Sequence, residues 1–268
     1  MIGDYRRYLV RRRFAPGTIK GRIVVLRRWL DHVGAGWRSA SHRDVESWID
    51  TRPVSAAVQR NYVSMLRSFY RWAMREGLCE RDPTALVDKP RLPRRLPRPA
   101  PDHEIAAVLA TAPHHIATMV ALMAGGGLRC CEVGALCWRD VRLEHCTIHV
   151  SGKGSRDRVV VLPEQVVWML TMLDTHDGPV FVNRDGNPYS ANRVSRLVRL
   201  QFMRHGYTTT AHQLRHRAAS AALAVAGDLL AVRDFLGHAS VATTQGYTKV
   251  AGGAAAATSS AIKLPHVI

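Results

Sequence analysis

The chain has no long hydrophobic run. Its 268 residues contain no stretch of about 18 uncharged apolar residues, the length that a membrane-spanning helix needs. The basic start MIGDYRRYLVRRR also lacks the apolar core and the small-residue cleavage site of a signal peptide. Both absences predict a protein of the cytosol that does not act in a membrane.

Cysteine and lysine are both scarce. Four of the five cysteines, Cys130, Cys131, Cys137 and Cys146, are close in sequence, but they match neither paired C-x-x-C spacing nor a secreted disulfide framework. We therefore expect reduced thiols in the core, with a zinc site as the less favoured alternative. Because 33 arginines stand against 5 lysines, each lysine is more informative than it is in an average protein.

Positive charge is in excess and is unevenly placed. The formal net charge is +17, of which residues 1–100 carry 22 Lys+Arg minus 9 Asp+Glu, or +13, and residues 101–268 carry 16 minus 12, or +4. Such a field attracts phosphate backbones whatever their sequence. Ribosomal and membrane-surface proteins can be equally basic, so the charge predicts a polyanionic partner without identifying it.

Residues 1–87 have the pattern of a small helical domain. One helix is expected to open at Thr18, with apolar residues on one face: Ile19, Ile23, Leu26 and Leu30. Arginines on the same segment lie off this apolar stripe and are candidate DNA contacts: Arg22, Arg27 and Arg28.

Two further helices are expected in this domain, a short one after Ser41 and a long one from about Ser55 to Arg75. The long helix carries apolar residues at helical spacing, which are more typical of a core than of a base-stacking surface: Val58, Tyr62, Met65, Phe69 and Trp72.

Residues 88–101 are expected to be an interdomain linker. Five prolines in this segment forbid a helix and favour an extended, stiff path. Its basic residues can follow a phosphate backbone, although a solvated linker is the alternative: Lys89, Arg91, Arg94, Arg95 and Arg98.

Residues 102–250 are expected to be a second domain, mainly α with a small antiparallel β-sheet. A helical pattern runs from Asp102 to about Gly125 and restarts near Cys130. VRLEHCTIHV and DRVVVLP then predict short antiparallel strands around a tight SGKGS turn with Lys153 at its tip. Further helices are expected at about 164–173, 190–204, 212–225, 228–235 and 241–247.

Six residues of this domain form the informative set. They are Arg129, Lys153, His212, Arg215, His238 and Tyr247. Each alone is weak evidence, because an H-x-x-R or an arginine beside glycines is a common accident. Their joint occurrence in this order is strong evidence.

At these residues the sequence resembles the tyrosine recombinases, the family of phage integrases and bacterial chromosome-dimer resolving recombinases. The stretch from HQLRHRAAS to TTQGYTKV resembles the family's second box, GGGLRCCEVGALCWRDV resembles its first, and the likeness covers nearly the whole chain. Two departures are the pair Cys130-Cys131 and Arg217, which stands where a small or hydroxyl residue is more usual.

The resemblance implies a role for each residue of the set. It assigns Arg129 and Arg215 as phosphate-binding arginines and Tyr247 as the nucleophile. Lys153 matches the hairpin lysine, His212 the histidine that opens H-x-x-R, and His238 the later His/Trp position. Glu132 matches a supporting acid.

Elementary chemistry agrees with these roles. Two arginines can neutralise a phosphorane-like state, and Lys153 can protonate the departing 5′-oxygen, which an arginine cannot readily do. Surrounding cations favour the phenolate of Tyr247, and His212 can assist removal of its proton. The products are a 3′-phosphotyrosine and a free 5′-hydroxyl. We expect no cofactor, since the chain has no G-x-x-x-x-G-K-[ST] loop, and no metal, since its carboxylates form no obvious two-metal site.

The resemblance also implies the assembly. The expected fold is a two-domain clamp, with the helical core-binding domain and the mixed α/β catalytic domain on opposite faces of the duplex. A protein that is a monomer when free is expected to form a tetramer on two double-stranded DNA sites with short inverted core repeats, and to exchange strands through a Holliday junction. The arm-binding domain of larger integrases is expected to be absent. The tail 251–268 is expected to dock in trans on a neighbour within the DNA-bound tetramer, and in the free monomer to fold back in cis or to be disordered; a frayed terminus without such a role is the alternative.

The favoured function is integration or excision of phage or mobile-element DNA in a bacterial host, with a directionality factor as a candidate partner. A chromosome-dimer resolving recombinase is the first alternative. A tyrosine-dependent nuclease or type I topoisomerase uses the same chemistry, and a non-catalytic DNA-binding regulator would explain the charge but would not need Lys153, His238 and Tyr247 in their present settings.

Overall fold

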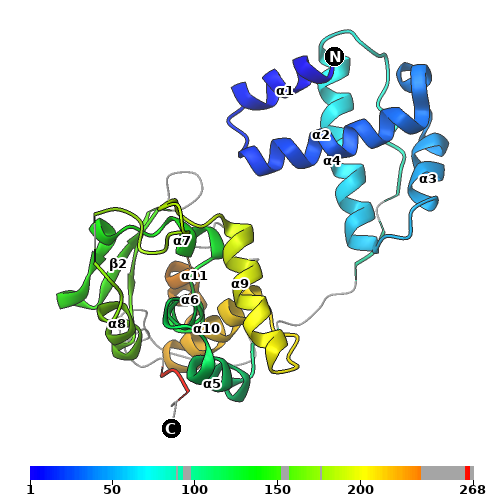
Figure 1. Cartoon of the computed structure of the whole chain (residues 1–268). Coiled ribbons are helices and arrows are strands. Elements are labelled where there is room, and N and C mark those ends of the chain that lie inside the picture. The colour runs from blue at the N-terminus through cyan, green and yellow to red at the C-terminus, as the bar shows by residue number, and fades with distance from the viewer. Residues whose placement is uncertain (89, 93–97, 152–156, 176, 237–262, 266–268) are drawn as a thin grey trace. The chain divides into compact units, whose positions relative to one another are not determined.

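The structure, a computed structural model, describes the chain except residues 89, 93–97, 152–156, 176, 237–262 and 266–268, and omits the side chains of 226, 229, 231, 233 and 234. The chain divides into two compact units, Met1–Arg94 and Arg95–Ile268. The division falls inside the proline-rich segment 88–101 (Figure 1).

Unit 1 is helical. It contains a short 3-10 helix at Gly34–Arg38 and the helices α1 (Ile2–Arg11), α2 (Pro16–Val33), α3 (His42–Asp50) and α4 (Ala56–Arg75). Helix α2 begins at Pro16, two residues before the predicted start, because proline has a helical φ and no N–H that the first turn would leave unbonded. The predicted start at Ser41 is confirmed by a capping box in which Ser41 and Asp44 bind each other's backbone N–H groups.

Aromatic side chains fill the core of unit 1. Of the five α4 residues that the helical spacing assigned to the core, Phe69 and Trp72 are buried. The other three, Val58, Tyr62 and Met65, are half-buried. The polar atoms among these rings are bonded: the Trp29 Nε1 donates to the Tyr70 hydroxyl at 2.9 Å, and that hydroxyl donates to the Trp37 carbonyl at 2.9 Å. The core therefore contains large rings without leaving these donors unpaired.

Unit 2 is mainly helical. Figure 1 shows α6 and α10 near its centre, with the sheet and α8 on one side and α9 on the other, and α6 contacts α8, α9 and α10. The helices are α5 (Asp102–Thr111), α6 (His114–Ala124), α7 (Cys130–Ala135), α8 (Glu164–Thr171), α9 (Ala191–Arg204), α10 (Ala211–Ala226) and α11 (Leu229–Leu236).

A three-stranded antiparallel sheet of order β1-β2-β3 completes unit 2 and confirms the predicted fold class. Its strands are β1 (Val141–Arg142), β2 (Thr147–Val150) and β3 (Arg158–Val161). In the register, Val150 lies opposite Arg158 and Ile148 opposite Val160.

The prediction of one helix from Asp102 to about Gly125 was wrong. The chain breaks after α5, where Ala112 is extended with ψ 150° and Pro113 caps α6. The proline ring disfavours the helical conformation of the residue before it. The break lets α6 turn into the interior, where every residue from Ile116 to Ala124 is buried.

The start of unit 2 is bonded to α10. The Ala100 N–H donates to the Gln213 carbonyl at 3.0 Å. The Arg217 guanidinium binds both carboxylate oxygens of Asp102, at 2.8 and 3.1 Å. Arg217, a departure from the family pattern, therefore has a defined carboxylate partner.

The cysteines are free thiols, but the expected core placement was wrong for four of them. Cys79 is buried, whereas Cys131 is exposed and Cys130, Cys137 and Cys146 are half-buried. Among the described residues, no group of three or more His, Cys, Asp or Glu side chains is arranged to hold a metal ion. No helix in the described part of the chain has the length and apolar character needed to cross a membrane.

Candidate active site

A glycine-rich loop joins α6 to α7 and places Arg129 at the N-cap of α7. Gly127 in this loop has φ +65°, and a Cβ there would lie 3.0 Å from the Leu236 side chain and 3.1 Å from that of Phe235. A glycine is needed at this position for its backbone conformation and for the close approach of α11. The loop thus brings Arg129 beside the end of α11.

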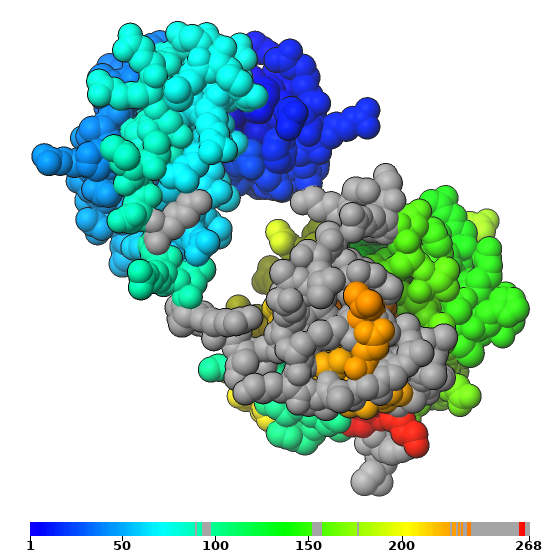
Figure 2. Space-filling view, turned by 180° about the vertical axis from the view of Figure 1, so that it is seen from behind, coloured from blue at the N-terminus to red at the C-terminus, as the bar shows by residue number. Residues whose placement is uncertain are grey.

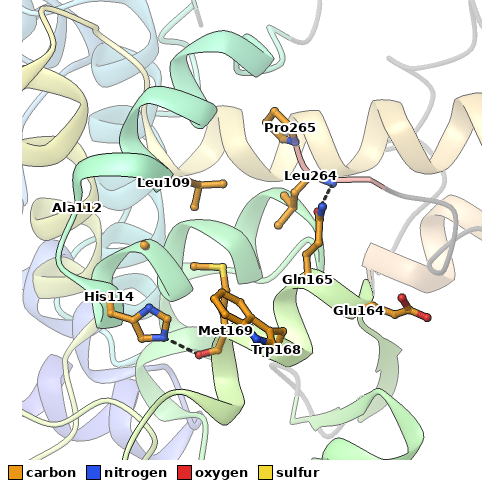
Figure 3. Close-up of a pocket in the computed structure, with 10 residues that line it drawn as sticks. Leu109, Ala112, His114, Glu164, Gln165, Trp168, Met169, Leu264 and Pro265 are labelled. Atoms are coloured by element: carbon orange, nitrogen blue, oxygen red, sulfur yellow. Dashed lines mark hydrogen bonds between the residues drawn. The ribbon is translucent and has the colours of Figure 1, made fainter. Parts of the chain in front are cut away.

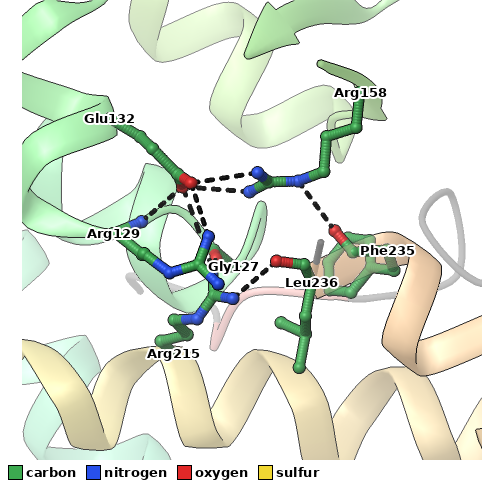
Figure 4. A network of polar contacts seen from close by, with 7 residues as sticks. All are labelled: Gly127, Arg129, Glu132, Arg158, Arg215, Phe235 and Leu236. Atoms are coloured by element: carbon green, nitrogen blue, oxygen red, sulfur yellow. Dashed lines mark hydrogen bonds and ion pairs between the residues drawn. The ribbon is translucent and has the colours of Figure 1, made fainter. Parts of the chain in front are cut away.

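Glu132, one turn into α7, is the centre of a polar network (Figure 4). Its carboxylate accepts from the Arg129 backbone N–H at 2.8 Å and from Arg129 Nη1 at 2.7 Å. Arg158 from β3 donates to both of its oxygens, Nη1 to Oε1 at 3.0 Å and Nη2 to Oε2 at 2.9 Å. Arg215 Nη1 from α10 lies 3.8 Å from Oε2. Three arginines from separate elements therefore meet at one carboxylate.

The carboxylate of Glu132 is buried, with its side chain 4% exposed. Burial by itself raises its pKa, but the hydrogen bonds and charge of Arg158, followed by the hydrogen bonds from Arg129, outweigh burial and lower the pKa to about 2. Glu132 is thus ionised at neutral pH, and its cluster with three guanidinium groups has a net charge of +2.

The two predicted phosphate-binding arginines differ in exposure. The side chain of Arg129 is 36% exposed, whereas that of Arg215 is 7% exposed. Arg215 donates to the carbonyl of Gly127, and its Nη2 donates to the carbonyl of Leu236 at 2.5 Å. Arg215 therefore joins the glycine loop to α11, and Arg129 is the more open of the pair.

His212 lies one turn before Arg215 on α10, and its ring contacts that of His216 at a centroid distance of 4.1 Å. Burial, followed by the charge of Arg215, lowers the pKa of His212. Burial together with the charges of His212 and Arg215 lowers the pKa of His216 to about 4. Both imidazoles are therefore neutral at pH 7, the form that can accept a proton.

The structure brings together Arg129, Glu132 and Arg215, with His212 on the same helix as Arg215. Lys153, His238 and Tyr247 lie outside the described residues. Sequence reasoning missed Arg158. The sequence pattern that could have found it is a charged residue two positions before Val160 in a predicted strand, because residues two apart on a strand share a face and Val160 is buried.

The candidate DNA-contact arginines also differ from one another. Arg27 and Arg28 of α2 are exposed. Arg22 is half-buried, donates to the Ser68 hydroxyl at 2.6 Å and lies 4.2 Å from the Phe14 ring centroid, so it is a packing residue as well. Arg91 and Arg98 are exposed, and Lys89, Arg94 and Arg95 lie outside the described residues.

A mainly apolar cavity of about 710 Å³ lies between α5, α6 and α8, and Leu264 and Pro265 of the C-terminal tail form part of its wall (Figure 3). Leu264 is 3% exposed, and its N–H donates to Gln165 Oε1 at 3.1 Å. The preceding carbonyl, that of Lys263, accepts from Arg217 Nη2 at 2.8 Å. Figure 2 shows these described tail residues, in red, against the surface of unit 2. In the single chain, Leu264 therefore docks in cis.

Two family models match the chain. The model of the phage integrase family matches residues 102–252, and that of the phage integrase N-terminal SAM-like domain matches residues 2–77. The chain is 34% identical over 256 residues to the tyrosine recombinase XerD of Xanthomonas campestris pv. campestris, with 84% of this chain and 79% of that protein covered.

It is also 30% identical over 265 residues to the tyrosine recombinase XerC of Lactobacillus delbrueckii subsp. bulgaricus, with 89% of this chain and 90% of that protein covered. A lambda integrase tetramer bound to a Holliday junction has the same fold, with a TM-score of 0.74 at 16% identity over 89% of this chain and 76% of that chain. The chain therefore belongs to the phage integrase family of tyrosine recombinases, enzymes that cut and rejoin DNA.

Proposed function

We propose that this recombinase cleaves DNA through Tyr247 at a phosphate bound by Arg129 and Arg215. The observation that carries the proposal is the meeting of three arginines at the single carboxylate of Glu132, with Arg129 partly open to solvent. A cluster with a net charge of +2 at a partly open site favours an anion, and a guanidinium can bind phosphate oxygens with two parallel hydrogen bonds.

In the proposed step the Tyr247 oxygen forms a bond to phosphorus and the bond from phosphorus to the 5′-oxygen breaks. Neutral His212 accepts the phenol proton, and Lys153 donates a proton to the departing 5′-oxygen. His238 donates a hydrogen bond to the phosphate. The 3′-phosphotyrosine conserves the energy of the phosphodiester, so rejoining reverses the step with a 5′-hydroxyl as the nucleophile and without ATP.

The proposed substrate is double-stranded DNA with short inverted core sites. Exposed arginines of α2 and of the linker supply phosphate contacts that do not depend on base sequence: Arg27, Arg28, Arg91 and Arg98. We propose that four protomers assemble on two sites and that the tail 251–268 docks in trans in that assembly. A tetramer bound to a Holliday junction is the state of the lambda integrase structure that shares this fold. A directionality factor stays a candidate partner.

The genomic role of this recombination is either resolution of chromosome dimers or integration of mobile DNA. The curated relatives, XerC and XerD recombinases at 30–34% identity, favour chromosome-dimer resolution at least as strongly as integration. Phage integration, the role favoured in the sequence analysis, stays a prediction. The test measures recombination between two directly repeated sites on one circular DNA, with either a chromosomal terminus site or a phage attachment site as the repeated site. The kind of site that recombines distinguishes the two roles.

The chemistry is tested with a nicked suicide duplex that carries a core site selected from random-sequence DNA. We expect the wild-type protein to form a covalent 3′-adduct, and Tyr247→Phe to bind the duplex but form none, because only the nucleophilic oxygen is lost. Tyr207→Phe is the matched control and keeps the adduct. An adduct in Tyr247→Phe would refute the assignment. Strand exchange between two labelled duplexes then separates a recombinase from a nuclease or a topoisomerase.

A further inference from the structure

Arg158 lies on the interior face of the small sheet. It is the first residue of β3, opposite Val150 of β2, and alternation places its side chain on the same face as Val160, which is 1% exposed. Its own side chain is 9% exposed. A guanidinium at such a position is costly to desolvate unless its donors are bonded and its charge is balanced.

The contacts of Arg158 meet both conditions. Nη1 and Nη2 bind the two oxygens of Glu132 in a parallel pair at 3.0 and 2.9 Å, which fixes the plane of that carboxylate. The same carboxylate holds Arg129 through its backbone N–H and its Nη1. The orientation of the Arg129 guanidinium therefore depends on Arg158 through Glu132.

Arg158 also holds the end of α11. Its Nε donates to the Phe235 carbonyl at 3.2 Å, while Arg215 Nη2 donates to the next carbonyl, that of Leu236. The last carbonyls of a helix have no intrahelical partner, and cations near them are stabilising. The two arginines thus fix the point at which the chain leaves α11, just before His238 in sequence.

We propose that Arg158 is a positioning residue for DNA cleavage, which orients Arg129 through Glu132 and fixes the end of α11. The proposal rests on the phosphate-binding role proposed above for Arg129. Arg158 does not contact the phosphate in this scheme. Its effect is on the geometry of the groups that do, and a misplacement of about 1 Å in such groups is sufficient to lower a rate about 100-fold.

The competing explanation is that Arg158 only stabilises the fold. A purely structural role would lower the free energy of unfolding but would leave the cleavage rate of the folded protein and its pH dependence unchanged. Arg217 offers a matched control, because it also binds a carboxylate with two nitrogens and donates to the backbone carbonyls of Ala124 and Lys263, yet its carboxylate partner is Asp102 and not Glu132.

The test compares Arg158→Gln, Arg158→Lys and Arg217→Gln with the wild type. The measured quantities are the single-turnover cleavage rate on the suicide duplex at saturating protein, the dissociation constant for the same duplex, and folding stability. We expect Arg158→Gln to cleave about 100-fold more slowly while its dissociation constant changes by less than about threefold. Arg158→Lys retains charge but not the parallel pair, so it should recover stability more than it recovers cleavage.

The pH profile supplies a second measurement. Glu132 faces Arg129, Arg158 and Arg215 from three elements, and His212 and His216 lie on the same helix as Arg215. Without Arg158 the carboxylate titrates nearer its ordinary range, so the ratio of Arg158→Gln to wild-type rates should fall further as the pH is lowered from about 7.5 to about 5. The histidines titrate in both proteins and cancel in this ratio. Arg217→Gln should show no such fall.

Wild-type cleavage rate and pH profile in a folded Arg158→Gln would overturn the inference. If that variant does not fold, Arg158→Lys distinguishes the two explanations. A cleavage rate that recovers in Arg158→Lys in proportion to its folding stability would show that Arg158 has a structural role only. Arg129→Ala separates this inference from the proposed function. If Arg129→Ala cleaves like the wild type, the proposed site is wrong; if Arg129→Ala is inactive while Arg158→Gln is normal, only the role of Arg158 is wrong.

Discussion

Glu132 is a single carboxylate whose ionisation is linked to the stability of unit 2. Its pKa falls from 4.5 to about 2 on folding, because Arg158 and Arg129 outweigh the effect of burial. A carboxyl group whose pKa is lowered by folding stabilises the fold at every pH above its pKa in the unfolded chain. This stabilisation, about 3 kcal/mol, is lost as the pH falls from about 4.5 to about 2.

We therefore expect Glu132→Gln to lower the free energy of unfolding by about 3 kcal/mol at pH 7, and the difference from wild type to close on acidification through that window. Denaturant titrations at pH 7, 5 and 3 measure it. Glu144→Gln, at an exposed carboxylate, is the control and should have little effect. A difference that is the same at every pH would contradict the linkage.

Residue patterns predicted part of this site and not the rest. Arg129, Glu132 and Arg215 could be found because short local motifs carry them. Arg158 could not, since its partner Glu132 is 26 residues away in sequence and the sequence does not show which long-range pairs form. The same holds for Arg217, 115 residues from Asp102.

At the scale of elements, α4 is the helix whose aromatic face forms the core of unit 1. Phe69 is fully buried, whereas Met74 on the same helix is 41% exposed. We expect Phe69→Ala to destabilise unit 1 by about 3–5 kcal/mol through loss of burial and formation of a cavity. Met74→Ala should change stability by less than about 0.5 kcal/mol. Thermal unfolding followed by tryptophan fluorescence measures both, and equal effects would contradict the assignment of this face to the core.

The elements themselves were largely predictable, because apolar spacing marks the buried face of a helix wherever the backbone permits one. Ile19, Ile23 and Leu26 of α2 are buried as their spacing predicts. Leu30, on the same predicted face, is half-buried against the same core. The same rule failed between α5 and α6, where apolar residues continue through the break. There Pro113 restricts Ala112 to an extended conformation, and this backbone effect overrides the pattern of side chains.

At the scale of the whole molecule, the excess of arginine makes DNA binding salt-dependent. Each phosphate neutralised contributes about 0.9 to the slope of log affinity against log salt. We expect Arg27→Ala to reduce that slope by about 1 without lowering the melting temperature. Arg22→Ala should also lower the melting temperature, because Arg22 bonds Ser68 and covers Phe14. Salt titrations of duplex binding measure the slopes, and an unchanged slope in Arg27→Ala would remove it from the DNA contacts.

The C-terminal tail gives a prediction about assembly. Leu264 is buried in cis at the wall of an apolar cavity in the single chain, and the proposed tetramer places the tail on a neighbour. We expect deletion of residues 254–268 to leave binding to a single half-site nearly intact and to weaken recombination of full sites. Leu264→Ser should reproduce the defect. Recombination at the wild-type rate by the truncated protein would show that the tail has no such role.

The bonds between the start of unit 2 and α10 also define how the molecule carries mechanical load. A pull on the linker reaches unit 2 at Ala100, bonded to Gln213, and at Asp102, bonded to Arg217. Gln213 and Arg217 flank Arg215 on one helix. Tension along the linker is therefore transmitted to α10 in addition to α5. Helix α10 also carries Arg215, which donates to the carbonyls of Gly127 in the glycine loop and of Leu236 at the end of α11.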